Sequence, residues 1–125
     1  MKVFNNKHEK GRHFEEEAVK YLKKKGFEIT ATNYETHFGE LDIVAEKKIE
    51  HLIVFIEVKA KEKFTGMHPF EAVDRRKQRT IIQCAKAYMM ENHVEKVFVR
   101  FDVVGIITDN DEVEEIEYLE DAFQG

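Results

Sequence analysis

The stretch GELDIVAEKKIEHLIVFIEVKAK, residues 39–61, contains two apolar runs separated by a short polar segment. The runs, residues 41–46 and 52–60, are rich in the β-branched and aromatic side chains that favour strands. We therefore predict two antiparallel strands joined by a turn centred on residues 49–50. Residues 27–34 have a similar composition, so a third strand is predicted to precede them in an antiparallel meander.

Three charged residues interrupt these apolar runs. Because side chains alternate between the two faces of a strand, Glu57 and Lys59 share one face and Val58 lies on the other. The turn centre places Asp42 opposite Glu57, with Cβ atoms about 4.5 to 5.5 Å apart. Two carboxylates this close repel each other unless a proton or a cation intervenes. The apolar surroundings favour a shared cation, and the alternative is an exposed sheet face with ordinary cross-strand salt bridges.

A helix is predicted before the strands. Residues 7–25 carry one apolar stripe that includes Phe14, and Gly26 follows as a C-terminal stop signal. On a helical wheel Glu15 lies at the margin of this stripe, whereas its neighbour Glu16 points away. We expect Glu15 to lean toward the sheet.

A second, long helix is predicted from Pro69, which suits a first helical turn, to about Asn92. Lys77 lies on its apolar stripe, and it either extends to the surface or contributes to a site. It belongs to the densest basic cluster of the chain, residues 75–79. That cluster is either a solvated helix face or a phosphate-binding surface.

Two further strands complete the predicted order, at residues 96–107 and, shorter, near 113–119. A helix between two strands calls for a right-handed crossover, so strand 96–107 should run parallel to strand 52–60. The predicted class is α/β, with an αβββαβ core whose mixed central β-sheet is flanked by helices. The length of 125 residues suits one domain over residues 1–125.

Composition limits the cellular context. The chain has one cysteine, Cys84, which we predict to be a buried apolar side chain on a helix. No apolar run approaches the roughly 18 residues of a membrane span, so we expect a cytoplasmic protein without a membrane segment.

The net charge is −5, but residues 109–125 hold eight acidic residues and no basic one. This acidic C-terminal segment is either a solvated edge strand or an autoinhibitory mimic of phosphate.

Six short blocks, in this order, resemble the PD-(D/E)XK nuclease superfamily, which includes the archaeal Holliday-junction resolvases, and more closely the bacterial YraN-like proteins. The resemblance runs from about Gly11 to Ile107 and implies a restriction-endonuclease-like fold. The blocks are GRHFEEEA at 11–18, FGELDIVA at 38–45, VFIEVKAK at 54–61, GMHPFEAV at 66–73, RKQR at 76–79 and RFDVV at 100–104.

The resemblance also implies roles for individual residues. Asp42 and Glu57 would be metal ligands and Lys59 the catalytic lysine, with Glu15 completing the acidic catalytic site. Lys77 would be an auxiliary basic residue.

The chain departs from the family pattern at one position. Phe14 stands where the family usually has Gly just before its Glu. A bulky ring at this position bears on how Glu15 approaches a metal ion.

The function that follows is a metal-dependent endonuclease that hydrolyses DNA phosphodiester bonds, with structured or branched DNA in repair or recombination as the candidate substrate. Mg²⁺ or Mn²⁺ suits carboxylate ligands joined by the backbone carbonyl of Val58, and the absence of clustered Cys and His disfavours zinc. The alternatives are a non-catalytic DNA-binding module and a protein-interaction domain. A homodimer is expected only by analogy with resolvases. The candidate DNA contacts are Lys63, Arg75, Arg76, Lys77 and Arg79.

Overall fold

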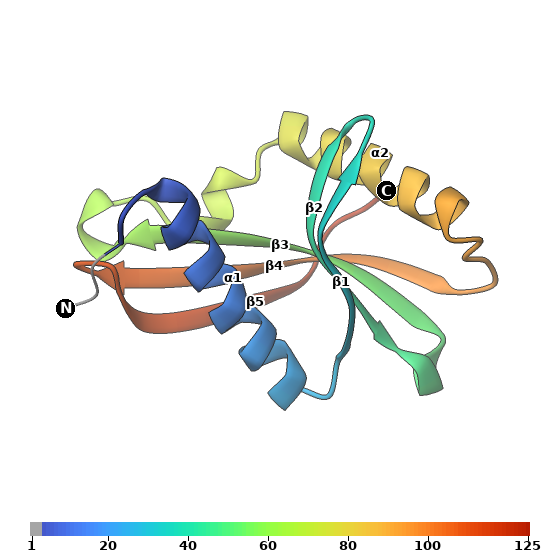
Figure 1. Ribbon diagram of the computed structural model, residues 1–125, viewed down its shortest axis with the longest axis horizontal. Helices are drawn as coiled ribbons and strands as arrows, with labels where there is room; N and C mark the ends of the chain where they lie inside the picture. Colours follow the sequence, from blue (N-terminus) through green and yellow to red (C-terminus); the bar gives the residue numbers. More distant parts are fainter. Residues whose placement is uncertain (1–3) are drawn as a thin grey trace.

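Five strands form one mixed sheet in which neighbours in space are also neighbours in sequence, in the order β1-β2-β3-β4-β5 (Figure 1). The computed structural model describes residues 4–125, so residues 1–3 of the predicted domain lie outside the described part. The elements are α1 (Lys7–Lys24), β1 (Glu28–Thr36), β2 (Gly39–Lys47), β3 (Leu52–Glu62), α2 (Arg75–Glu91), β4 (Phe98–Asp109) and β5 (Glu112–Phe123), with 3-10 turns η1 (Lys48–Glu50), η2 (Lys63–Thr65) and η3 (Pro69–Ala72). The predicted α/β class is confirmed.

The strand directions follow from the connections. Short turns join β1 to β2, β2 to β3 and β4 to β5, and these pairs are antiparallel. Strand β4 runs parallel to β3 because α2 crosses between them. The predicted meander and the predicted mixed sheet are therefore both confirmed.

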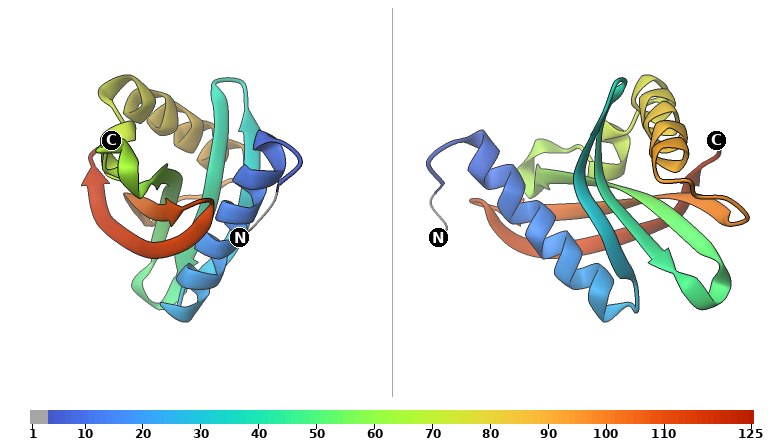
Figure 2. Two further views of the ribbon diagram at one scale, coloured as in Figure 1. Left: turned by 90° about the vertical axis from the view of Figure 1, so that its left-hand side faces the viewer. Right: turned by 45° about the vertical axis from the view of Figure 1, so that its right-hand side comes forward.

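The sheet carries a hydrophobic core on each face. Ile53 and Phe55 of β3 pack in the core that contains α2, whereas Val54 and Ile56 pack in the core that contains α1. The two helices accordingly lie on different sides of the strongly twisted sheet (Figure 2). Cys84 of α2 is fully buried, as predicted.

The β2–β3 hairpin has the predicted register. Its ladder runs from Lys47 opposite Leu52 to Ile43 opposite Ile56. Beyond that pair, the backbone N–H of Val58 donates to Oδ2 of Asp42 at 2.9 Å. A charged side chain thus replaces a ladder contact at the point where the candidate site begins.

Two predicted boundaries are wrong. Pro69 begins the separate turn η3 rather than α2, which starts at Arg75 because Asp74 caps it by accepting the N–H of Lys77 at 2.9 Å. Strand β5 extends to Phe123, beyond the predicted 113–119, because it continues past an irregularity in its pairing with β4.

Gly105 of β4 brings η3 close to the sheet. A Cβ atom at this position would lie 2.9 Å from Cε1 of Phe70, closer than Cβ atoms approach other groups, and in tight contact, at 3.1 Å, with Cβ of Pro69. The glycine therefore lets η3 pack directly on β4, and η3 leads into α2.

Helix α1 has the expected ends. The side chain of Asn6 accepts the N–H of Glu9 at its start, and Gly26 follows its end with φ +92°. Neither helix in residues 4–125 is long and apolar enough to cross a membrane.

Candidate active site

Helix α1, strands β2 and β3 and helix α2 all contribute residues to one cavity of about 300 Å³. It lies where the β2–β3 ladder ends, so the strands supply charged side chains there instead of paired backbone. The predicted catalytic residues meet in this cavity. It is lined by Gly11, Phe14, Glu15, Asp42, Glu57, Val58, Lys59, Ala60 and Lys77.

Glu57 is the most deeply buried carboxylate of the cavity, with 3% of its surface exposed. Its Oε2 lies 3.5 Å from Nζ of Lys59 and 3.4 Å from Nζ of Lys77. Lys59 stands on the same strand face, as strand alternation predicts, and Lys77 reaches across from α2. The structure therefore brings Lys77 into the cluster instead of extending it away into solvent.

Asp42 has no comparable cation beside it among these contacts. Burial and, after it, the nearby Glu57 raise the pKa of Asp42 to about 7. The hydrogen bond from Val58 and the more distant charge of Lys77 lower the pKa but do not offset these effects. An ionised Asp42 is therefore costly unless a cation arrives.

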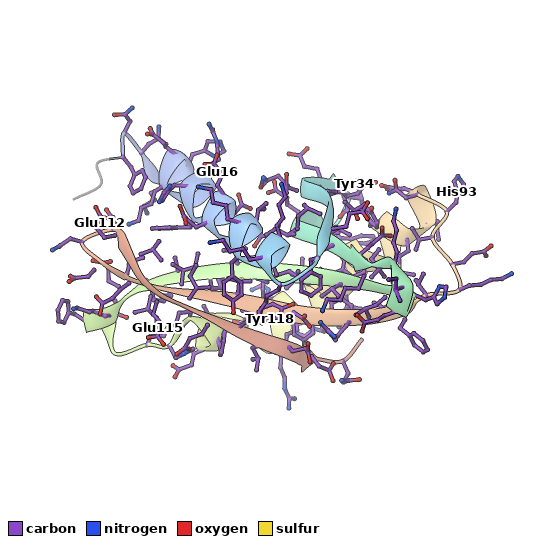
Figure 3. All side chains as sticks on the ribbon, turned by 90° about the horizontal axis from the view of Figure 1, so that it is seen from below. Glu16, Tyr34, His93, Glu112, Glu115 and Tyr118 are labelled. Carbon is purple, nitrogen blue, oxygen red and sulfur yellow. The ribbon has the colours of Figure 1, made fainter. Side chains whose placement is uncertain are left out.

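Glu15 approaches this pair from α1. Its side chain is half-buried while Glu16 is exposed, as the helical wheel predicts (Figure 3). Burial, together with the charges of Asp42 and Glu40, raises the pKa of Glu15 to about 7. The neighbouring Phe14 has 4% of its surface exposed and packs in the α1 core, so its ring fills one wall of the cavity.

Glu40 belongs to the acidic cluster, although sequence reasoning missed it. Carboxylate oxygens of Glu15, Glu40 and Asp42, one from each, lie within 4.8 Å of one another. The signal was present, since Glu40 lies two residues from Asp42 and thus on the same side of an extended strand. Four carboxylates are gathered here, and the two ammonium groups both lie against Glu57. The surplus negative charge suits a hard divalent cation.

The predicted DNA contacts separate into two places. Arg75, Arg76 and Arg79 are exposed on the first turns of α2, the helix that carries Lys77. Lys63 lies elsewhere, with Nζ 3.1 Å from Asp109 Oδ2 and 3.1 Å from Glu114 Oε2 of the acidic segment.

The acidic C-terminal segment forms the end of β4, a turn and the edge strand β5, as the edge-strand alternative predicts. Its turn is tied to β3, because Glu62 accepts the backbone N–H groups of Asn110 at 2.9 Å and Asp111 at 3.3 Å. Lys10 of α1 lies 2.6 Å from Asp111.

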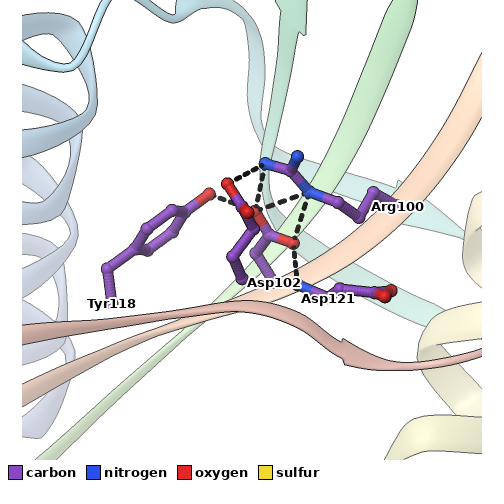
Figure 4. Close-up of polar contacts among 5 residues, drawn as sticks. Arg100, Asp102, Tyr118 and Asp121 are labelled. Carbon is purple, nitrogen blue, oxygen red and sulfur yellow. Dashed lines mark hydrogen bonds and ion pairs between the residues drawn. The ribbon is translucent and has the colours of Figure 1, made fainter.

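A second charged cluster, also missed, lies around Asp102 of β4 (Figure 4). Asp102 is completely buried, and it accepts hydrogen bonds from Arg100, from the Tyr118 hydroxyl and, at 2.8 Å, from the N–H of Asp121. Tyr118 projects from β5 toward α1, where its ring lies 6.1 Å from that of Tyr21 (Figure 3). An aspartate inside the apolar run after Arg100 was the available signal.

Relatives of this chain share nearly its whole length. A family model described as "Uncharacterised protein family UPF0102" matches residues 14–106. The chain is 41% identical over 120 residues to a UPF0102 protein of Desulforapulum autotrophicum, covering 96% of this chain and 97% of the relative. It is 39% identical over 124 residues to a UPF0102 protein of Acetivibrio thermocellus, covering 95% and 94%. The chain belongs to the UPF0102 family, the YraN-like family that its sequence resembles.

Proposed function

We propose that this protein is a metal-dependent endonuclease of the PD-(D/E)XK type that hydrolyses DNA phosphodiester bonds, with structured or branched DNA as its substrate class. One observation carries the proposal. Asp42 and Glu57 enter one cavity from adjacent strands together with Lys59 and Glu15, and Glu40 lies beside this group. That combination of acids and a lysine is the one the resemblance implies.

The residues fit a divalent cation. Asp42 and Glu57 offer carboxylate oxygens, and the pKa of Asp42 is raised to about 7 chiefly by burial and by Glu57, a condition that a cation would relieve. Mg²⁺ or Mn²⁺ would be held by Asp42, Glu57 and the backbone carbonyl of Val58. When bound, such an ion polarises a phosphoryl oxygen and lowers the pKa of water.

The side chains of the chain itself supply the remaining chemistry. The Lys59 ammonium, held 3.5 Å from Glu57, is a compact charge that can orient the attacking water or stabilise negative charge developing on the phosphate. Lys77 shares Glu57 with it, so the two amines hold that carboxylate in place. The exposed Arg75, Arg76 and Arg79 would contact flanking phosphates. The expected homodimer would present two such sites to paired strands.

The test is cleavage of labelled four-way junctions, linear duplexes and single strands with Mg²⁺ and with Mn²⁺. We expect metal-dependent cleavage that falls by at least about 100-fold in Glu57→Gln and in Lys59→Ala. The matched controls are Glu95→Gln and Lys86→Ala, which change the same residue types at exposed positions outside the cavity.

Cleavage by either active-site variant at the wild-type rate would overturn the proposed chemistry. Salt-dependent DNA binding without cleavage would identify the non-catalytic binding module instead. Neither DNA affinity nor divalent-metal binding would identify the protein-interaction domain. Sedimentation of the purified protein checks the homodimer.

A further inference from the structure

Asn33 of β1 is an unusual residue beside the acidic cluster. Its φ is +51°, a left-handed conformation that costs most residues about 1 to 2 kcal/mol and that asparagine tolerates better than most. Its neighbours Thr32 and Tyr34 pair with Ile43 and Leu41 of β2. Asn33 therefore stands beside Asp42 in the strand order, on the side away from β3.

The side chain of Asn33 faces two carboxylates. Its amide is oriented with the nitrogen toward them, because the reverse orientation would set acceptor against acceptor. The nitrogen then lies 2.8 Å and 2.9 Å from the two oxygens of Glu15 and 3.1 Å from Oε1 of Glu40. An amide nitrogen carries two hydrogens, so one group can donate to both acids.

A neutral donor has a specific advantage at this place. Glu15 and Glu40 each lie near Asp42, and their like charges repel. A lysine would relieve that repulsion, but its ammonium would also compete with a metal ion for the same oxygens. An amide draws the carboxylates together and leaves their negative charge in place.

We infer that Asn33 is a positioning residue that holds the carboxylates of Glu15 and Glu40 beside Asp42, so that the cluster is assembled before a divalent cation binds. The inference rests on the proposed function for the identity of the cation. It assigns to β1 a part in the site that the strand pattern alone does not indicate. Asn33 would act through these two carboxylates and not as a metal ligand itself.

The test uses Asn33→Gly, which keeps the left-handed backbone accessible and removes the amide. Asn110→Gly is the matched control, because Asn110 also has a left-handed φ, of +49°, but lies in the β4–β5 turn. Calorimetric titration with Mn²⁺ should show affinity weakened about 10-fold or more in Asn33→Gly and unchanged in Asn110→Gly, the usual scale for residues that orient metal ligands. In cleavage assays the concentration of Mg²⁺ for half-maximal rate should rise by a similar factor, while the rate at saturating Mg²⁺ stays near that of the wild type.

Wild-type affinity for Mn²⁺ in Asn33→Gly would overturn the inference. If the wild-type protein itself binds no Mn²⁺, the proposed function fails and a double-mutant cycle decides the positioning role. The loss in urea midpoint caused by Asn33→Gly should then be smaller in a Glu15→Ala background than in the wild type. Equal losses in both backgrounds would overturn the inference independently of any metal.

Discussion

Two charged clusters interrupt buried strands of this protein, and they differ in how their charges are met. Around Asp102, a guanidinium, a hydroxyl and a backbone N–H converge on one carboxylate. Around Asp42, acids outnumber amines and a cavity of about 300 Å³ opens beside them. The first cluster is complete within the chain, whereas the second is arranged to receive something from outside.

The pKa values express the same difference. Burial and the hydrogen bond to Asp102 raise the pKa of the Tyr118 hydroxyl well above its usual value, so it remains a donor at any physiological pH. Burial and Glu57 raise the pKa of Asp42 to about 7, so its charge is opposed by the fold. A buried network in which every polar group has a partner supports stability. A buried cluster with surplus charge leaves its carboxylates available to bind a ligand.

The largest effect should come from removing the carboxylate at the centre of the Asp102 cluster. Asp102→Ala leaves Arg100 and the N–H of Asp121 without their buried acceptor, so we expect a loss of about 3 to 5 kcal/mol in the free energy of unfolding. Urea denaturation followed by circular dichroism measures it. In metal-free buffer at about pH 8, Asp42→Asn should instead leave stability equal or increased. Comparable losses in the two variants would remove the distinction between the clusters.

A smaller effect should appear as a pH dependence of stability in the metal-free protein. The folded pKa of Asp42 is raised from 3.8 to about 7, so the unfolded chain loses this proton first as the pH rises. The stability contributed by protonated Asp42 is therefore lost between these two pKa values. From about pH 4 to about pH 8 the wild type should lose up to about 4 kcal/mol relative to Asp42→Asn. Mg²⁺ should restore much of that loss at the upper end.

Parallel stability curves for the wild type and Asp42→Asn over this pH range would contradict the expectation. So would an equal response of both proteins to Mg²⁺. Thermal unfolding with a chelator in one arm and Mg²⁺ in the other supplies both measurements.

The smallest effect should come from the ion pairs of the acidic segment. Lys63 lies 3.1 Å from both Asp109 and Glu114, but all three side chains are substantially exposed. Solvent and salt screen such pairs. Lys63→Ala should shift the urea midpoint by a small fraction of the Asp102→Ala shift at low salt, and the shift should vanish in about 1 M NaCl. A shift in urea midpoint that persists at high salt would contradict this expectation, because it would mean that these ion pairs are shielded from solvent.

The sequence was sufficient for the Asp42–Glu57 pair because local rules determine it. Alternation along two apolar strands and a four-residue turn leave one register that buries both apolar sets. Lys59 follows from the same alternation. The apolar stripe of its helix left Lys77 open between the surface and the site, and the long-range contact with Glu57 decides it.

Other features depend on contacts that no local pattern encodes. Asn33 adopts a positive φ within a strand, and Glu40 reaches its partners only because α1 crosses near β1 and β2. Helix α2 begins after Asp74 and not at the predicted Pro69, because the side chain of Asp74 accepts the N–H of Lys77. The N–H of Asp121 meets Asp102 where the β4–β5 pairing is irregular, between Phe101 and Val103.

The absence of a side chain at Gly105 also bears on the arrangement of charges in the site. Gly105 is the ladder partner of Lys59, and it is where η3 rests on the sheet. Since η3 leads into the helix that carries Lys77, we expect a bulkier residue at Gly105 to push η3 outward and to move the Lys77 ammonium away from Glu57. A methyl group at Gly105 should therefore widen the separation between the Lys77 ammonium and Glu57 without changing either side chain.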